Sequence, residues 1–319
     1  MVTRRQFGLV GVVAPFLAST VMAQESAASE RERQAPAYYR LKAGGSRVTA
    51  LCDGYLNLPR TLFPAATESS AAELARAAFT APGPLPTAVN AFAVEAGDAL
   101  LLVDAGVGPS RGPSTGRLPD EMRKAGLDPT RVSAVLLSHL HIDHCGGLLN
   151  ASGGRMFPDA EIMLSEPELR FWADSGLESR APAAMHPMIR VAREVLDAYR
   201  GRVRTFAPGT EIVSGIRSVP LFGHTPGQTG FILGTGGDAL FIWADMVHVA
   251  AYQFVHPDWG LTFDVDQAAA VATRKRIFEQ VASDRMRVAG MHLAFPGIGN
   301  VVRDGAAYRY VPSPWQPFG

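Results

Sequence analysis

The chain has 319 residues, of which 47% are hydrophobic and 19% charged, so it can bury a sizeable core and global disorder is excluded. Its 30 basic and 30 acidic side chains cancel, which argues against binding to nucleic acid or to an anionic membrane, where a basic excess is needed. Two cysteines exclude a disulfide scaffold and an all-thiolate metal cluster, whereas eight histidines remain as sources of metal ligands or proton carriers.

The N-terminal residues 1–23 have the composition of an export signal. Arg4 and Arg5 precede an apolar run over 7–22, and Ala23 completes a cleavage site of small residues. The arginine pair resembles a bacterial twin-arginine signal, which predicts a periplasmic or secreted protein. The alternative is a membrane anchor, but the run is short for a span that needs about 20 apolar residues. We therefore expect no stable membrane insertion once the signal is removed.

The rest of the chain predicts a lead-in followed by one folded domain. Residues 24–38 are polar and rich in alanine, which predicts a flexible segment, and 39–319 form the domain. In chain order, the pattern predicts one or two strands over 47–58 with a break at 53–54, a helix over 70–79, a hairpin of 88–96 with 99–104, a loop over 106–116, a helix over 120–125, strands over 132–137 and 161–164, helices over 166–173 and 184–199, strands over 212–219, 229–233 and 239–244, a helix over 266–282, a strand over 287–291 and a hairpin over 301–311. Strands outnumber helices in both halves, which predicts two packed sheets with helices outside.

Four ligand-type side chains lie in one short segment directly after a buried strand. Alternation along an extended stretch would put His139, His141 and Asp143 on one side, and the turn at 145–147 can swing His144 to a second position. Imidazole and carboxylate groups suit a borderline cation such as zinc. Four of them are too many for one ion with an open position and suit a pair of ions.

Further polar residues stand at strand ends or in turns later in the chain. His224 lies in a Gly-His-Thr-Pro-Gly turn, and Asp245 and His292 each end an apolar strand. Asp104 also ends a strand, and we interpret it as an outer partner that orients a ligand histidine, with a simple turn acid as the alternative. His248 either lines a pocket and donates a proton to a leaving group or packs at the surface.

The remaining candidates have simpler interpretations. His186 and His256 each precede a proline and are expected in loops or at the surface. Cys52 and Cys145 could form a disulfide in an exported chain, but two small buried side chains are the favoured reading.

The pattern His-x-His-x-Asp-His, followed by a distant His, Asp and His, resembles the metallo-β-lactamase superfamily. The stretches 223–227, 245–250 and 292–299 are similar to the branch that contains methyl parathion hydrolase and related lactonases and arylesterases. The resemblance implies an α/β fold, an αββα sandwich of two mixed sheets flanked by helices, with a binuclear metal site. It also implies which residues hold each ion: His139, His141 and His224 for one, Asp143, His144 and His292 for the other, and Asp245 for both. Zinc is the expected metal, with Mn, Co or Fe as alternatives, and a homodimer agrees with the resemblance.

Such a metal pair predicts hydrolysis without a serine nucleophile. Two cations sharing a water would convert it to a bridging hydroxide and polarise a C=O or P=O group. Asp143, Asp245 and His248 are therefore the candidate catalytic residues.

The predicted substrate is a small neutral molecule. Leu56, Leu58, Trp172 and Phe254 could form an apolar pocket wall, although large apolar side chains are more often core. The candidate segments carry no clear cluster of Arg or Lys, which phosphomonoesters usually require. An organophosphate triester, a lactone or an aryl ester is therefore expected. The alternatives are a β-lactamase-type amide hydrolase, a mononuclear-iron thioester hydrolase or dioxygenase of the same fold, and a non-catalytic binding protein.

Overall fold

The computed structural model describes residues 34–108 and 114–317. The export signal predicted over 1–23 lies outside these residues, as does most of the lead-in predicted over 24–38. From residue 37 onward the chain forms one compact unit. In the part that is described, no helix is both long enough and apolar enough to cross a membrane.

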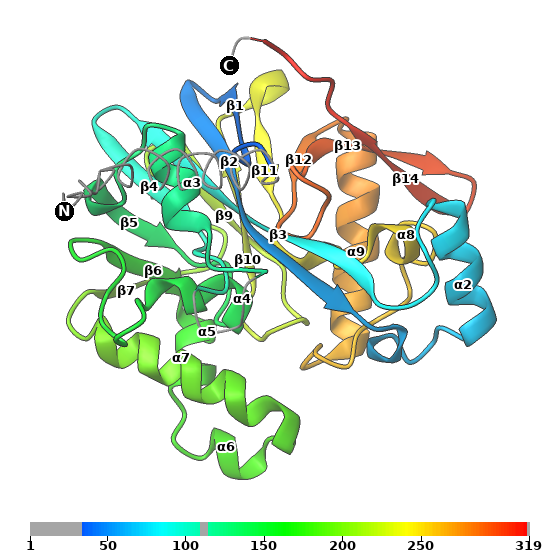
Figure 1. Cartoon of the computed structure of the whole chain (residues 1–319), viewed down its shortest axis with the longest axis horizontal. Coiled ribbons are helices and arrows are strands. Elements are labelled where there is room, and N and C mark those ends of the chain that lie inside the picture. Colours follow the sequence, from blue (N-terminus) through cyan, green and yellow to red (C-terminus); the bar gives the residue numbers. More distant parts are fainter. Residues whose placement is uncertain (1–33, 109–113, 318–319) are drawn as a thin grey trace, which may run out of the picture. The chain divides into compact units, whose positions relative to one another are not determined.

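The first sheet has seven strands in chain order (Figure 1). They are β1 (Tyr38–Ala43), β2 (Ser46–Leu58), β3 (Leu85–Ala96), β4 (Ala99–Val103), β5 (Val132–Leu136), β6 (Glu161–Ser165) and β7 (Val203–Phe206). Strands β1 to β4 pair antiparallel, whereas β4 to β7 pair parallel. The sheet is therefore mixed, and its parallel half directs the carboxyl ends of β4, β5 and β6 to one edge.

The second sheet also has seven strands and is mixed. Its strands are, from one edge to the other, β14 (Ala307–Pro312), β13 (Ile298–Asp304), β12 (Arg287–Ala289), β11 (Leu240–Ile242), β10 (Thr229–Leu233), β9 (Ile216–Pro220) and β8 (Glu211–Val213). Only β11 and β12 pair parallel among them. Their carboxyl ends therefore also meet at one edge, where chemistry-bearing loops can gather.

Eight α-helices accompany the sheets in the described residues. They are α2 (Glu68–Ala77), α3 (Leu118–Lys124), α4 (Ile142–Cys145), α5 (Glu166–Trp172), α6 (Leu177–Arg180), α7 (His186–Ala198), α8 (Ala250–Gln253) and α9 (Gln267–Ser283). Capping residues explain where two of these helices begin. Ser165 caps α5 ahead of Pro167, and the Asp266 side chain accepts from Ala269 N at 2.9 Å at the start of α9.

Strand alternation divides the core into layers. In β4, Leu101 and Val103 pack between the two sheets, whereas Leu102 packs toward α3 and α7. In β11, Leu240 and Ile242 face the space between the sheets, whereas Phe241 packs against α9. Each sheet thus has one face on its partner and one face under helices. The predicted αββα sandwich of two mixed sheets is confirmed.

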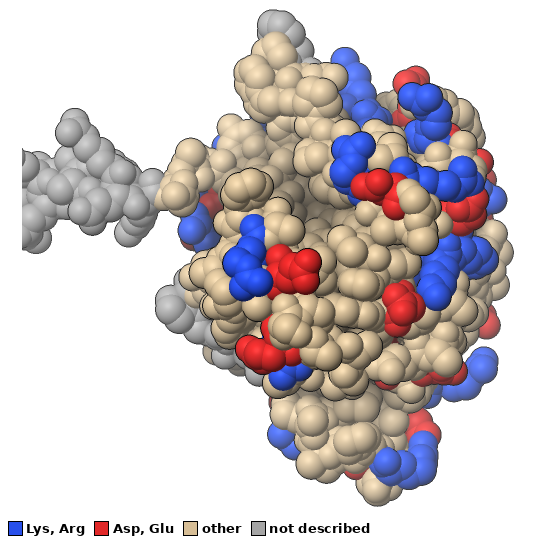
Figure 2. Space-filling view, turned by 90° about the vertical axis from the view of Figure 1, so that its right-hand side faces the viewer, with Lys and Arg blue, Asp and Glu red and all other residues tan. Residues whose placement is uncertain are grey.

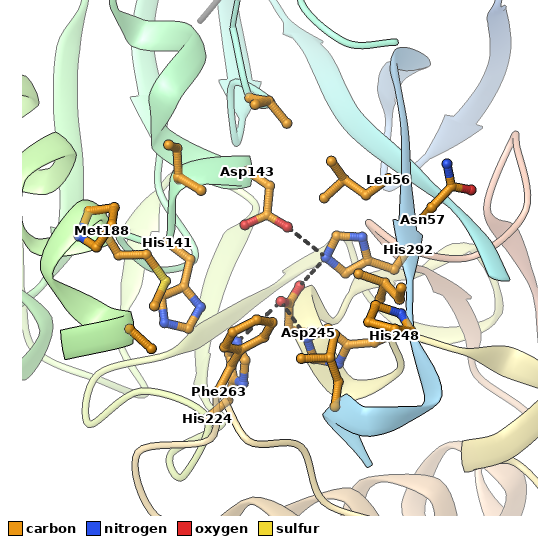
Figure 3. Close-up of a pocket in the computed structure, with 17 residues that line it drawn as sticks. Leu56, Asn57, His141, Asp143, Met188, His224, Asp245, His248, Phe263 and His292 are labelled. Atoms are coloured by element: carbon orange, nitrogen blue, oxygen red, sulfur yellow. Dashed lines mark ion pairs between the residues drawn. The ribbon is translucent and has the colours of Figure 1, made fainter. Parts of the chain in front are cut away.

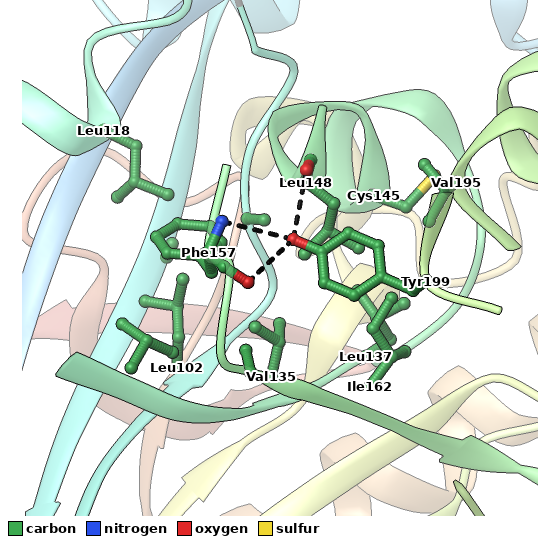
Figure 4. Packing of buried hydrophobic residues seen from close by; sticks show 14 of the residues in the cluster. Leu102, Leu118, Val135, Leu137, Cys145, Leu148, Phe157, Ile162, Val195 and Tyr199 are labelled. Carbon is green, nitrogen blue, oxygen red and sulfur yellow. Dashed lines mark hydrogen bonds between the residues drawn. The ribbon is translucent and has the colours of Figure 1, made fainter. Parts of the chain in front are cut away.

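One buried hydroxyl joins the end of α7 to the loop between α4 and β6. Tyr199 is buried, donates to the carbonyls of Leu148 (3.2 Å) and Phe157 (3.3 Å), and accepts from Phe157 N at 3.2 Å (Figure 4). The ring fills apolar space while the hydroxyl satisfies backbone groups that water cannot reach.

Two features of the first sheet differ from the prediction. Strand β2 is continuous across a bulge at Asp53, because that buried carboxylate accepts the backbone N–H groups of Val107 (2.9 Å), Gly116 (3.1 Å) and Leu118 (2.9 Å). Strands β1 and β7 were not predicted, since both are edge strands with only partly buried side chains. Cys52 and Cys145 are free thiols in the structure.

The surface carries both signs of charge in close proximity. On the face in Figure 2, basic and acidic side chains are interspersed. Ion pairs among the described residues include Arg190 with Glu178 and Arg204 with Glu161.

Candidate metal centre

The histidine-rich segment changes conformation halfway along. It leaves β5 in an extended conformation that carries His139 and His141, and α4 begins at Ile142. The expected alternation therefore ends before Asp143, which lies with His144 and not with His139 and His141. The reason is local: one helical turn replaces the two-residue period, so the side chains no longer alternate between two opposite faces.

Loops from the second sheet bring the distant residues to this segment. His224 lies between β9 and β10, Asp245 follows β11 and His292 follows β12. Two groups in which all ligand atoms lie within 4.8 Å of one another comprise His139, His141, His224 and Asp245 in one, and Asp143, His144 and His292 in the other; a third such group joins His248 to Asp245 and His292. All seven residues named from the sequence are thus brought together, in the two sets that the resemblance implied.

Asp245 lies between the two groups and presents one oxygen to each. Its Oδ2 lies 3.3 Å from His224 Nε2 and 3.6 Å from His139 Nε2. Its Oδ1 lies 3.2 Å from His144 Nε2. The same oxygen lies 3.3 Å from His292 Nε2, a contact that Figure 3 marks. Asp143 adds a second carboxylate 3.5 Å from His292. Asp245 therefore has the geometry of a shared ligand.

The atoms that face the centre have no hydrogen-bond partner among the described residues. They are the buried Nε2 atoms of His139, His141, His144, His224 and His292, and Oδ1 of Asp245. Buried polar atoms are seldom left unpaired, so a convergent set of them indicates a missing partner. Nitrogen and carboxylate donors in this arrangement fit two divalent cations.

The pKa values of His139, His141 and Asp245 agree with metal-ready ligands, whereas those of His144, His224 and His292 are raised because nearby carboxylates outweigh burial. Burial lowers the pKa of His139 well below its usual value and that of His141 to about 3, so both rings are neutral. Burial opposes ionisation of Asp245, but His144, His292 and the other rings hold the pKa of its carboxyl well below its usual range. Neutral imidazole and ionised carboxylate are the forms that bind metal.

Outer partners hold four of the rings, and His139 Nδ1 lies 3.0 Å from the Ser138 hydroxyl. His144 Nδ1 lies 2.7 Å from Asp104, which also accepts from the backbone and hydroxyl of Ser138 at 2.7 Å each. His224 Nδ1 lies 2.7 Å from Asp264, and His292 Nδ1 lies 2.9 Å from the Ala88 carbonyl. Such contacts fix the tautomer that leaves Nε2 free. The structure thus places Asp104 where the sequence interpretation put it.

Asp264 and the Ala88 carbonyl were not found from the sequence. Asp264 lies in the loop before α9, 40 residues beyond His224, with no motif around it. Its other oxygen accepts from Leu261 N at 2.7 Å, a local turn contact that many loop acids make. A backbone carbonyl carries no sequence signal at all. Only the tertiary structure could reveal either partner.

Backbone strain occurs beside the centre. Asp104 has φ +57° and Ala244, which precedes Asp245, has φ +50°. Residues other than glycine adopt this region at a cost, and they do so where surrounding contacts hold them. Both strained positions aim a carboxylate of the centre or of its outer shell.

A cavity of about 450 Å³ opens onto the centre (Figure 3). Its wall contains Leu56 and Leu58 as predicted, together with Met188 and Phe263. Apart from the ligands and His248, the polar side chain in this wall is Asn57, and none of the described lining residues is Lys or Arg.

Two predicted wall residues lie elsewhere, which corrects the sequence interpretation. Trp172 is fully buried behind His141, with ring centroids 5.6 Å apart, and is part of the core under α7. Phe254 packs on Phe278 and Tyr310 at 5.1 and 5.7 Å, in the core beneath α9. Both are large apolar side chains near the site in sequence, and both are buried in the hydrophobic core.

The other histidines differ in position. His248 lines the cavity, with Nε2 2.9 Å from Asp245 Oδ2 and its ring stacked on His292 at 5.1 Å. Its backbone N–H donates to Gln253 at 2.7 Å. His186 begins α7 and His256 stacks on Trp259 at 4.3 Å, and neither lines the cavity.

Comparison with known proteins identifies the family. The sequence profile described as Metallo-beta-lactamase superfamily matches residues 84–292. N-acyl homoserine lactonase AiiB of Agrobacterium fabrum (strain C58) is 34% identical over an aligned stretch of 76 residues, which covers 18% of this chain and only 28% of the relative.

Solved structures are similar over almost their full length. AidC, a dizinc quorum-quenching lactonase, has a TM-score of 0.82 at 26% identity and covers 88% of this chain and 98% of its own. The hydrolase AbOPH of the beta lactamase superfamily has a TM-score of 0.83 at 29% identity, with coverage of 89% and 100%. Because the profile covers more than half of the chain, including the histidine segment and His292, the chain belongs to the metallo-beta-lactamase superfamily.

Proposed function

We propose that this protein is a binuclear metal-dependent hydrolase that cleaves a neutral ester-like bond, with a lactone as the first candidate substrate. The observation that carries the proposal is the position of Asp245. Each of its carboxylate oxygens faces a separate group of unpaired imidazoles, at the floor of an apolar cavity. A centre for a single ion would not need a shared carboxylate.

The two groups define the ligands. His139, His141 and His224 would hold one ion, Asp143, His144 and His292 the other, and Asp245 both. Zinc is the expected metal, because the donors are nitrogen and carboxylate oxygen and because the similar lactonase AidC is described as dizinc. When bound, such a pair supplies Lewis acidity to the scissile group and lowers the pKa of a water nucleophile.

His248 is the chain's own candidate for proton transfer. It lines the cavity and contacts Asp245 through Nε2, and its buried Nδ1 has no hydrogen-bond partner among the described residues. Gln253 fixes the backbone at His248. In the proposal, Asp245 holds the His248 ring in place, and the ring takes up the proton that the attacking water loses and passes it to the leaving group.

The wall supports a neutral substrate with an apolar arm. Leu56, Leu58, Met188 and Phe263 offer hydrocarbon surface, and Asn57 offers one amide that can orient a polar group of the substrate. The lactonase names of AiiB and AidC favour a lactone. Organophosphate triesters and aryl esters are the further candidates, since the same nucleophile and Lewis acids serve all three.

A kinetic and metal analysis tests the proposal. The zinc-loaded protein is assayed on a lactone, an aryl ester, a phosphotriester and a β-lactam, and its metal content is measured. We expect two equivalents of zinc per chain and a preference for the lactone above a hundredfold, about 2.7 kcal/mol of transition-state binding.

The matched variants are Asp245→Ala and Asp258→Ala, since Asp258 is exposed and does not line the cavity. Asp245→Ala should lose hydrolysis and metal, and Asp258→Ala should keep both. A folded wild-type protein that binds no metal would refute the proposal. One equivalent of iron with oxygen consumption would favour the mononuclear-iron alternative, and a β-lactam preference the amide hydrolase.

A further inference from the structure

Glu168 is a buried carboxylate that the chemistry above does not use. It lies in α5, is fully buried and does not line the cavity. Its Oε1 accepts from Leu140 N at 2.9 Å and from Trp172 Nε1 at 2.6 Å. Its Oε2 accepts from Thr225 Oγ1 at 2.7 Å and from Gly227 N at 3.0 Å. Four donors converge on this one side chain.

Three of the four donors belong to segments that carry one group of ligands. Leu140 stands between His139 and His141, and Thr225 and Gly227 follow His224. Trp172 packs edge-on against His141 at 5.6 Å, so its indole links Glu168 to that ring as well. The three histidines of the first group thus share a common support, although they come from two distant parts of the chain.

The other group has different supports. His144 is held by Asp104, and His292 by the carbonyl of Ala88. Neither of these contacts includes Glu168 or one of its donors. The two halves of the centre therefore have different buried carboxylates as outer partners, although the Ser138 hydroxyl contacts both His139 Nδ1 (3.0 Å) and Asp104 (2.7 Å).

The loop after His224 is shaped to reach Glu168. A side chain at Gly227 would place Cβ 2.2 Å from Glu168 N, so only glycine allows this approach. Ser165 Oγ, at the start of α5, donates to the Gly227 carbonyl at 2.6 Å. Both backbone groups of Gly227 are thus bound by the first turn of α5.

The ionised form of Glu168 suits this environment. Three of its partners, two backbone N–H groups and the indole, can only donate, so each needs an acceptor. Burial raises the pKa of Glu168, and the four donors oppose that rise. A side chain that itself carries N–H donors would face these partners with the wrong polarity.

We propose that Glu168 is the positioning residue for one ion of the pair, the ion assigned to His139, His141 and His224. It ties the segment of the first two ligands to the loop of the third and so sets their spacing. The inference rests on the proposed function, because it concerns the same binuclear centre. Loss of this carboxylate should weaken one half of the centre and leave the half of Asp143, His144 and His292 intact.

The test compares Glu168→Gln with Glu166→Gln, a matched change at an exposed position of the same helix. Zinc content and the two zinc dissociation constants are measured by titration against a competing chelator, with no activity assay. Wild type and Glu166→Gln should bind two ions. Glu168→Gln should keep one ion at wild-type affinity and bind the other at least about tenfold more weakly, as changes to outer partners of a ligand do.

Cobalt spectra identify the weakened half. His224→Ala and His292→Ala, loaded with one cobalt ion, provide reference spectra in which one or the other group has lost a ligand. Singly loaded Glu168→Gln should match His224→Ala. Trp172→Phe, which keeps a ring against His141 and removes one donor, should shift the same affinity by a smaller factor, as should Thr225→Val.

The outcomes separate the two proposals. Unchanged affinities in Glu168→Gln, equal weakening of both ions, or a match to His292→Ala would overturn the role of Glu168 alone. If Glu168→Gln fails to fold, Trp172→Phe and Thr225→Val decide the question by the same criterion. A wild-type chain that binds no metal would overturn the proposed function itself, and the inference with it.

Discussion

At the scale of single residues, the histidines of the centre differ in what their second ring nitrogen contacts. His144 and His224 each contact a carboxylate, whereas His292 contacts a neutral carbonyl. A carboxylate partner makes the imidazole a stronger ligand than a carbonyl does, because negative charge raises the basicity of the ring. The two carboxylate partners serve different groups, so each half of the centre contains one strengthened histidine.

The first prediction concerns Asp104. Asp104→Asn keeps the shape of the side chain but removes the charge beside His144, so we expect metal affinity to fall by about 10- to 100-fold in the half that contains His144. Chelator titration of zinc checks this, with the exposed Asp98→Asn as control. An affinity equal to wild type would mean that Asp104 serves only Ser138 and the strained turn.

At the scale of elements, α9 is tied to the closing hairpin of β13 and β14 by a charged network. Arg303 Nε donates to Glu279 at 2.9 Å, and the Tyr308 hydroxyl donates to the same carboxylate at 3.2 Å. The hydrogen bond from Arg303 lowers the pKa of Glu279 from 4.5 to about 2. The network is exposed, so salt and solvent screen it.

The second prediction follows from this pKa. A carboxyl whose pKa is lower in the folded state stabilises the fold above its unfolded pKa, and this contribution is lost as pH falls through the folded pKa. Glu279→Gln should therefore lower the midpoint of thermal unfolding at pH 7, and its difference from wild type should shrink as pH falls from 4.5 toward 2. Scanning calorimetry at several pH values measures this.

The control for the second prediction is the exposed Glu194→Gln on α7, which should show little difference at any pH. A Glu279→Gln difference that stays constant between pH 7 and 3 would contradict a contribution from the carboxylate charge.

The histidine segment shows where the alternating sequence pattern no longer predicts the position of a side chain. The strand before the histidine segment was predicted, but α4 interrupts the alternation and moves Asp143 to the group of His144. A helix of one turn has too few residues for a periodic signal. The side chain that was expected with His139 therefore belongs to the other half of the centre.

At the scale of the whole molecule, the centre lies where strand ends of both sheets meet. The histidine segment and Asp104 follow β5 and β4 of the first sheet, and Asp245 and His292 follow β11 and β12 of the second. Neither sheet supplies a complete group of ligands. Bound metal would therefore link the two sheets across the sandwich.

The third prediction concerns metal removal. A ligand that binds only the folded state stabilises it by about 4 kcal/mol at a thousandfold excess over its Kd, so stripping the metals with a chelator should lower the unfolding midpoint by roughly 10 °C. Zinc should restore it. Asp245→Ala should respond far less, because it lacks the ligand that both groups share, and an equal response of the two proteins would contradict a structural link through the metals.

The sequence by itself determined which side chains could bind metal, and the tertiary structure decided how these side chains are arranged and supported. Four ligand types in one short segment and three more at strand ends predicted a metal pair, because spacing along a strand or turn is a local property. The support of Glu168 from Leu140 and Thr225 and that of Asp264 for His224 span 28, 57 and 40 residues. No local sequence period predicts such long-range contacts. The burial of Trp172 in the core could not be predicted from a local period either.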